Sequence, residues 1–583
     1  MYSKSKLGIS TPAAAVAIVL LIVGVAVGYL TGSAMQPSAT TVTSTVTSTV
    51  GTRETVTLTQ TTTQLQTVTQ TVTQVTTTTP TEVKKLKDTI TIGTTERLQT
   101  TLDPANAVGW FAVNILYNVG RGLVSYEAGT DKIVPEIATS WTISPDGTEY
   151  IFNLRKDVKF SNGHPVTAKT FEFSLRRAIE LKGPPTFFIR QVVDKPEDVT
   201  ALDDYTLRIK LKYPFAPFLS MLAISAAPTY PVDPSVVKPN EFYTGIYIGP
   251  GPYQIAEHVQ DVMIRLTPNP YYYGEPPATP NIIIKQYRDP SAMALALRTK
   301  EIDLVMRGGL TPSDINVFKQ NPDFEVKEAP LVQMRGLMLN TALPPLNDIK
   351  VRQAIAYALD RSEIVDGVFQ GTVLPLYSII PRGISGGVNY FHYIYGEGNI
   401  ESAKKLLREA GYSETNKATI EITYDGVRYG VTEHNTATII KKQLEATGLI
   451  EVKLNPVETA KFTQLYLGNP YPGLIQSFLY GWWADYLDPD DYIWTFYQSS
   501  FSALIGTYVN NTAIEPLLIK QRSLLNFEER FPLIIEVQKL GAEHCSTIPL
   551  WQPTQIAIHI KGLEGVVLGP DGSFRFWTYS LPA

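Results

Sequence analysis

Most of the chain alternates between apolar positions spaced for strands and apolar positions spaced for helices. Residues 141–154 alternate on both sides of the turn sequence Ser-Pro-Asp-Gly-Thr at 144–148, which predicts a β-hairpin. A strand at 420–424, a helix at 432–447 closed by Gly448 and a strand at 452–457 predict a βαβ unit with a parallel pair of strands. Helices are also expected after Thr167, at 348–359, at 402–410 and at 528–542. Residues 88–583 are therefore expected to fold as α/β.

The first 35 residues have a different pattern. Ala13 to Leu30 are eighteen residues without a charge, and Lys4 and Lys6 precede them. This length suits a single membrane-spanning helix with the following chain outside the cell. A cleaved secretory signal is the alternative, with Gly32-Ser33-Ala34 as its cleavage site, and residues 8–10 resemble the processing site of archaeal pilin-like signals.

Residues 36–87 consist mainly of Thr, Val, Ser and Gln. Thr and Val alternate as in a strand, but such a strand would have no apolar core to pack against. We therefore interpret the segment as a hydroxyl-rich, low-complexity stalk that carries the globular part near the membrane.

Composition narrows the class of protein. The 583 residues include 44% hydrophobic and 18% charged residues, which is enough apolar surface for several compact domains. The net charge of -5 comes without a dense basic stretch, so nucleic acid is not an expected partner. Cys545 is the single cysteine, and therefore an intrachain disulfide, a CxxC metal site and an N-terminal lipidated cysteine are excluded.

Motifs for catalysis are missing from the sequence. The six histidines form no HExxH or H-x₃₋₅-H pair, and no GxSxG or GxxxxGK[ST] motif occurs. We therefore expect no enzyme activity, no metal site and no cofactor. An extracellular hydrolase remains an alternative, because Asp485 with Asp488 or Asp490 would supply the two carboxylates of a glycosidase.

Residues 481–492 have the composition of a ligand-binding loop. Aromatic residues and carboxylates alternate here around Pro489. Rings supply stiff contact area, while a carboxylate binds an ammonium group or accepts hydrogen bonds from sugar hydroxyls. Alternatively, Trp482 and Trp483 are core residues and the segment after Leu487 begins a helix.

Several blocks resemble one protein family. Residues 134–147, 152–155 and 158–168 resemble the signature of the family 5 extracellular solute-binding proteins of ABC importers, the oligopeptide-, dipeptide- and nickel-binding group. Residues 102–104, 249–253, 347–358 and 482–489 match in the same order, so the resemblance covers 88–583, and we assign the chain to an archaeal member. The lipid-anchor cysteine usual in the family is absent.

This resemblance implies a type II periplasmic-binding-protein fold, a two-lobed Venus flytrap of the larger variant with an extra domain in lobe one. Lobe one is expected at 88–128, 248–331 and 553–583, with the extra domain at 129–247. Lobe two is expected at 332–552, with the chain crossing near 333–340 and returning near 551–555.

The resemblance also implies a ligand site between the lobes. In peptide-binding members the Asp after Trp-x-Ala binds the ammonium terminus, and Asp485 has that position. Further ligand contacts are expected from Trp482, Trp483, Tyr486, Trp110, Tyr117 and Tyr253. The implied function is capture of oligo- or dipeptides by lobe closure and delivery to a permease and its ATPase. An oligosaccharide-binding protein and a membrane-anchored sensor are the alternatives.

Overall fold

The computed structural model describes residues 41–49, 55–63, 85–224, 228–306, 309–427, 430–467 and 475–583. It contains two compact units, Met1–Val83 and Lys84–Ala583. Within the described part of the chain, no helix combines the length and the apolar character needed to cross a bilayer. The membrane segment expected at 13–30 lies outside the described residues.

The first unit contains two antiparallel strands, β1 (Thr41–Thr49) and β2 (Thr55–Thr63), with Thr41 opposite Thr63. The sequence argument against strands is therefore wrong for these residues, while the role of 36–87 as a stalk stays a prediction. Thr and Val are β-branched and favour extended backbone, and two paired strands satisfy each other's backbone groups even without an apolar core.

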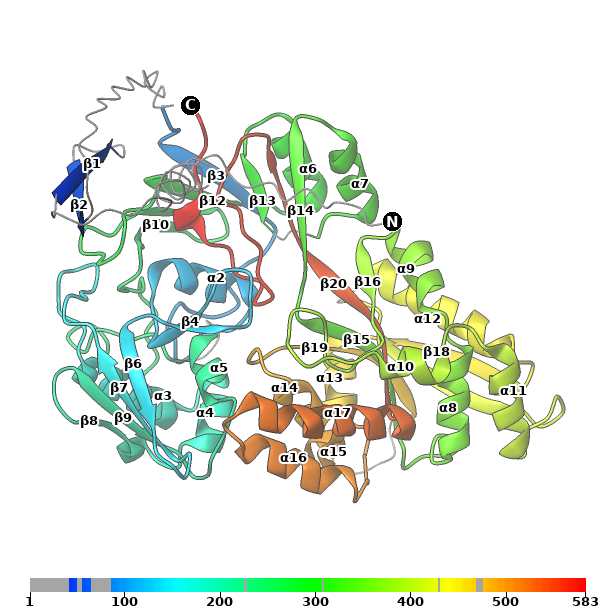
Figure 1. The fold of residues 1–583 in the computed structure, drawn as a ribbon. Coiled ribbons are helices and arrows are strands. Elements are labelled where there is room, and N and C mark those ends of the chain that lie inside the picture. Colours follow the sequence, from blue (N-terminus) through cyan, green and yellow to red (C-terminus); the bar gives the residue numbers. More distant parts are fainter. Residues whose placement is uncertain are drawn as a thin grey trace, which may run out of the picture. The chain divides into compact units, whose positions relative to one another are not determined.

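The second unit is built around one long strand, β20 (Thr547–Ile560), which belongs to two sheets (Figure 1). The first sheet has the order β10-β11-β12-β3-β13-β20, and β14 pairs with the other edge of β20. Its remaining strands are β3 (Thr89–Thr94), β10 (Tyr253–Val259), β11 (Met263–Pro268), β12 (Asn281–Gln286), β13 (Leu304–Met306) and β14 (Phe324–Pro330). Strands β12, β3 and β13 run parallel.

The second sheet continues from the other half of β20 in the order β20-β15-β19-β17-β18, with β16 also paired to β20. Its strands are β15 (Gln333–Leu339), β16 (Val373–Pro375), β17 (Ala418–Asp425), β18 (Ile450–Val457) and β19 (Ser477–Trp483). The βαβ unit predicted from sequence is confirmed, because β17 and β18 are parallel and flank α12 (Gly430–Glu445).

The two sheets meet where two chain segments pass side by side. Residues 554–560 of β20 pair with β14, whereas residues 547–551 pair with β15. Between β14 and β15 lie only Leu331 and Val332. The fold is thus a mixed α/β, two-lobed one, in which β20 and the β14–β15 segment connect the lobes.

A separate four-stranded sheet has the order β6-β7-β9-β8. Its strands are β6 (Ala138–Ile143), β7 (Glu149–Leu154), β8 (Val199–Ala201) and β9 (Thr206–Lys210), and β4 (Val124–Tyr126) pairs with β5 (Ile133–Pro135) nearby. The predicted hairpin is confirmed by the antiparallel pairing of β6 and β7. Thr167 precedes α3, and its N–H donates to Thr170 Oγ1 at 3.1 Å.

The helices cover these sheets. The first-sheet region has α2 (Trp110–Val119), α6 (Pro290–Arg298), α7 (Pro312–Gln320) and η3 (Phe576–Thr578); the four-stranded sheet has α3 (Ala168–Leu181), η1 (Pro184–Thr186), α4 (Phe187–Val192), η2 (Pro196–Asp198) and α5 (Phe218–Ala223). The second-sheet region has α8 (Ile349–Ala358), α9 (Arg361–Phe369), α10 (Tyr390–Tyr395), α11 (Ile400–Glu409), α13 (Thr459–Leu467), α14 (Asp490–Tyr497), α15 (Ser499–Leu504), α16 (Ile514–Ser523) and α17 (Phe527–His544). Asp348, Asp360 and Asn526 cap their helices through their side chains.

The lobes are in contact in this structure. One apolar cluster runs from the four-stranded sheet to residues 484–497 of the second lobe. The rings of Phe188 and Phe215 lie 5.9 and 6.0 Å from that of Tyr486, both edge-on. The two lobes therefore pack against each other through this apolar cluster.

Candidate functional site

The acidic loop, defined as residues 484–491, runs from the end of β19 into the first turn of α14 and lies beside the lobe connection. Two hydrogen bonds fix it there: the N–H of Ala484 donates to the carbonyl of Val332 at 3.1 Å, and the hydroxyl of Tyr492 donates to the same carbonyl at 2.9 Å. Pro489 immediately precedes α14, which is the helix start weighed in the sequence analysis. The loop is therefore placed by the hinge segment itself.

Two acids of this loop are neutralised by arginines. Asp488 accepts two hydrogen bonds from Arg530, at 2.8 and 2.7 Å. Asp490 is fully buried and pairs with Arg522 at 2.8 Å. Burial raises the pKa of Asp490, but the Arg522 guanidinium outweighs burial and holds the pKa below its ordinary value. Neither acid is available as the second carboxylate that the hydrolase alternative requires.

Asp485 has no such partner. It is half-buried, and none of the described residues forms an ion pair with it. Burial raises the pKa of Asp485 to about 7. Its own N–H donates to Asp491 Oδ2 at 3.2 Å, and Trp482 Nε1 donates to the same oxygen at 3.1 Å.

Asp491 differs from Asp485 because it is enclosed, only 1% exposed. Burial and then the neighbouring charge of Asp485 raise the pKa of Asp491 well above its ordinary value. We therefore take Asp491 as the protonated member of the pair. Asp485 is then the acid that becomes charged near neutral pH.

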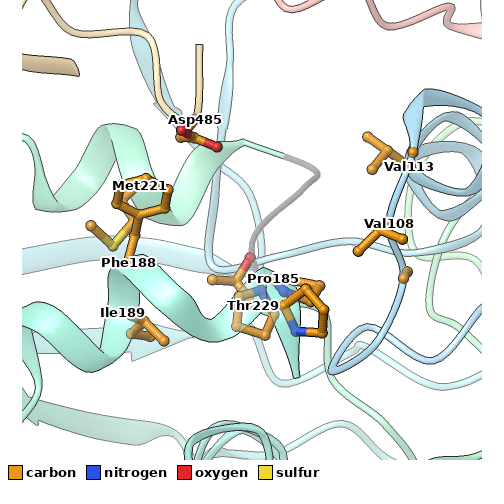
Figure 2. Close-up of a pocket in the computed structure, with 12 residues that line it drawn as sticks. Val108, Val113, Pro185, Phe188, Ile189, Met221, Thr229 and Asp485 are labelled. Atoms are coloured by element: carbon orange, nitrogen blue, oxygen red, sulfur yellow. The ribbon is translucent and has the colours of Figure 1, made fainter. Parts of the chain in front are cut away.

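Asp485 faces a pocket of about 210 Å³ (Figure 2). The other described lining residues come from the first-sheet region and from the segments around the four-stranded sheet: Ala107, Val108, Gly109, Val113, Pro184, Pro185, Phe188, Ile189, Met221, Pro228 and Thr229. In Figure 2 Asp485 lies at one end, with Met221 and Phe188 beside it and Val108 and Val113 across from it. The pocket thus forms between the lobes.

Two aromatic residues next to Asp485 in the sequence pack against other side chains. Trp482 is half-buried and packs edge-on against Phe496, with ring centroids 6.2 Å apart. Tyr486 is only 1% exposed, and its hydroxyl donates to Asp490 at 2.8 Å. Neither ring is among the described lining residues of the pocket, and Tyr486 packs between the lobes against Phe188 and Phe215.

Trp110 and Trp483 come together at a different place. A Cβ added to Gly572 would lie 3.1 Å from the Trp483 ring, and Trp110 Nε1 donates to the Gly572 carbonyl at 3.0 Å. Trp110 also lines a second pocket, of about 190 Å³, with Gln333, Pro553 and Gln555 at the lobe connection. The start of α2 therefore separates two neighbouring pockets.

Tyr117 and Tyr253 do not reach these pockets. Tyr253 is fully buried, and its hydroxyl donates to the Thr279 carbonyl at 2.7 Å. Tyr117 lies 5.4 Å from the Trp577 ring and faces a separate cavity of about 70 Å³. Tyr253 is thus enclosed in the first lobe and Tyr117 lines a cavity of its own with Arg121 and Arg575, and ligand contacts from these two residues stay a prediction.

Sequence reasoning missed the apolar walls of the pocket. They come from residues 107–113, from residues 184–189, and from Met221 with Pro228 and Thr229, which are far apart in the chain and are brought together by the fold. Pro184 and Pro185 belong to the second of these segments. A pair of prolines between two helices is the one local signal that marked this segment as a rigid turn.

Two α/β lobes joined by paired strand segments, with a pocket lined by both lobes, define a two-lobed solute-binding protein. Residues 132–503 match the family described as bacterial extracellular solute-binding proteins, family 5, middle. The chain belongs to this family, whose members are extracellular or periplasmic binding proteins.

Characterised relatives cover most of the chain. It is 26% identical over 490 residues to the dipeptide-binding protein of Escherichia coli, covering 80% of this chain and 89% of that protein. It is 35% identical over 313 residues to the nickel-binding periplasmic protein of the same organism, covering 52% and 57%. Among solved structures, the periplasmic binding protein DppA from Helicobacter pylori in complex with the peptide STSA is 25% identical, with a TM-score of 0.68 over 85% of this chain and 98% of that chain.

Proposed function

We propose that this protein captures peptides outside the cell by pairing their terminal ammonium group with Asp485 and closing its two lobes around them. The observation that carries the proposal is the position of Asp485, a carboxylate without a cation partner in the described chain, in a pocket between the lobes. A buried carboxylate favours an ammonium because the charge of each compensates the lost hydration of the other.

The same pocket is less suited to an oligosaccharide. Sugars are commonly held by several rings and several polar groups, and the pocket has one ring among its described lining residues, Phe188. Two of the tryptophans expected as ligand contacts lie elsewhere, Trp482 against Phe496 and Trp110 at the second pocket. The titles of the relatives, which name dipeptides and the peptide STSA, support a peptide ligand as well.

Closure of the two lobes on a ligand is expected because residues of both lobes line the pocket. A ligand stabilises the closed form only through contacts that the open form lacks. Asp485 comes from the second lobe and residues 107–113 and 184–189 come from the first, so a ligand that touches both walls has that differential affinity. We propose a lobe boundary at 331–332 and 552–553, with an extra domain in lobe one at 129–247 around the four-stranded sheet.

The closed protein would deliver its ligand to the permease and ATPase of an ABC importer. We further propose that the apolar run at 13–30 anchors the protein in the cell membrane and that residues 36–87 link the anchor to the binding unit. A tether raises the local concentration at the permease without adding contacts.

Calorimetric titration tests the proposal. A tripeptide with a free amino terminus, its N-acetylated form and a malto-oligosaccharide are titrated into the wild type, Asp485→Asn and a control, Asp366→Asn, which changes an exposed carboxylate on α9. We expect the free-amine peptide to lose at least about 100-fold in affinity in Asp485→Asn, because an uncompensated buried ammonium costs about 3–5 kcal/mol. Asp366→Asn should bind as the wild type does. Binding of the oligosaccharide, or equal binding of both peptide forms, would contradict the proposal.

A further inference from the structure

We infer that the pocket beyond Asp485 selects peptides whose first side chain is apolar and of medium size. This inference rests on the proposed function, because the ammonium must first be held by Asp485. The first side chain leaves the same carbon atom as the ammonium group, so a terminus bound at Asp485 places that side chain in the same pocket.

The described side chains that line the pocket beyond Asp485 are almost all apolar. Apart from Asp485, the described lining side chains are aliphatic, proline, methionine or aromatic, with Thr229 as the one exception. The Thr229 hydroxyl already donates to the carbonyl of Leu222 at 3.1 Å, and the residue is only 2% exposed. A polar first side chain would lose hydration here, and the described lining offers it few polar atoms, the Thr229 hydroxyl being buried and Asp485 being engaged by the ammonium group.

The charges of the described lining residues also favour an apolar first side chain. The described lining residues include no lysine, arginine or histidine, and Asp485 is their one acid. An aspartate side chain would meet that carboxylate without a cation nearby. A lysine side chain would compete with the peptide's own ammonium for a single carboxylate, and one of the two cations would remain uncompensated.

The volume of the pocket limits the size of the peptide's first side chain. About 210 Å³ corresponds to roughly seven waters at ~30 Å³ each, which accommodates an ammonium group with a side chain such as leucine. The wall at 184–185 is held close to the 105–109 segment, because a Cβ on Gly183 would lie 1.9 Å from the Ala105 carbonyl oxygen. Phe188 is fixed edge-on against Tyr486. These rigid walls limit expansion toward larger side chains.

The test is a matched peptide series. Leu-Ala-Ala, Asn-Ala-Ala, Asp-Ala-Ala and Lys-Ala-Ala, together with N-acetyl-Leu-Ala-Ala, are titrated into the full-length protein. Leucine and asparagine have nearly the same shape, so their comparison isolates polarity. We expect Leu-Ala-Ala to bind about 10- to 100-fold more tightly than Asn-Ala-Ala, as expected for full burial of one leucine side chain.

The outcomes separate the two proposals. Equal affinity for the leucine and asparagine peptides, with binding lost on acetylation, would overturn the selectivity and leave Asp485 as the ammonium site. No binding of any free-amine peptide would overturn the proposed function itself. Binding of N-acetyl-Leu-Ala-Ala as tight as that of Leu-Ala-Ala, with Asn-Ala-Ala bound weakly, would overturn the role of Asp485 while supporting an apolar pocket.

A variant adds a charge to the wall. Val113 is half-buried on α2 and lines the pocket, and the control Val317 is 50% exposed on α7. In Val113→Asp we expect the Lys-Ala-Ala to Leu-Ala-Ala affinity ratio to rise at least tenfold, whereas Val317→Asp leaves it unchanged. Val113→Asn should weaken Leu-Ala-Ala without improving Lys-Ala-Ala. An unchanged ratio in Val113→Asp that folds as the wild type does would overturn the inference.

Discussion

The two ends of the acidic loop bury carboxylates in opposite ways. At the α14 end, Asp488 and Asp490 each have an arginine, from α17 and α16 respectively. At the β19 end, Asp485 faces the pocket without a cation among the described residues. The chemistry of the side chains is the same, so their surroundings decide their roles.

Within this one short segment, the paired acids therefore have a structural role and the unpaired acid has a binding role. The paired acids attach the loop to the helices of the second lobe, and their charges are already compensated. The unpaired acid carries the cost of burial in the free protein, and a bound cation would relieve that cost. A stability loss at a binding residue is expected wherever the ligand supplies the missing partner.

The largest effect is expected from removing an arginine at the α14 end. Arg530→Met leaves Asp488, which is 7% exposed, without its cation, and should lower the free energy of unfolding by about 3–5 kcal/mol. The shift in the midpoint of thermal unfolding measures this loss of stability. The double variant Asp488→Leu with Arg530→Met should recover most of the loss, since apolar residues replace a buried pair well. A fully stable Arg530→Met would show that the pair does not hold the loop.

At the β19 end, removing the charge of Asp485 is expected to raise the free energy of unfolding. The pKa of Asp485 lies near 7 in the folded protein, above its ordinary value of 3.8, so the unfolded chain loses this proton first as pH rises. Stability therefore falls between about pH 4 and pH 7, and Asp485→Asn removes that loss. We expect the variant to be more stable without ligand at pH 7.5 by about 2 kcal/mol, less than the full shift because the carboxylate is half-buried. The gain should vanish at pH 4; a gain that persists there would have another origin.

Ligand affinity should depend on pH through the same group. Below about pH 7, binding an ammonium must expel the proton of Asp485, so the affinity should fall about tenfold per pH unit. Above about pH 8 the free amine of the peptide loses its own proton, and the affinity should fall again. Titrations from pH 5 to 9 measure this profile. The acid limb should be absent in Asp485→Asn, and an acid limb that remains there would belong to another group.

A smaller effect is expected at the contact between the lobes. The Tyr126 hydroxyl donates to the Ser220 carbonyl at 2.8 Å and accepts the N–H of Leu487 at 3.0 Å. Tyr126→Phe leaves that N–H buried without a partner, at about 1 kcal/mol, and should lower peptide affinity about fivefold by weakening the closed form. Isothermal titration calorimetry measures this change in peptide affinity. Unchanged affinity would mean that this contact also exists in the open form.

Much of the fold could be predicted from local pattern. The hairpin at 138–154 and the βαβ unit at 418–457 follow from period-two alternation, turn residues and a capped helix, which are properties of short segments. The strands at 41–63 were missed because the absence of a core was given more weight than the β-branched composition.

The candidate site was predictable only in part. Asp485 stood out because acids and rings are concentrated around it, and the fold does bring it to a pocket between the lobes. The cations that neutralise its neighbours, Arg522 and Arg530, lie more than thirty residues away on other helices. Tyr253 could not be told from a ligand contact by sequence, because its burial depends on packing across the whole first lobe.

A crystal structure of the protein with a bound peptide tests the central claim most directly. We expect the terminal nitrogen of the peptide within about 4 Å of a carboxylate oxygen of Asp485, at ion-pair distance, with the first side chain between Val108 and Phe188. A peptide whose amino terminus lies away from Asp485, for example in the second pocket beside Trp110, would contradict the account.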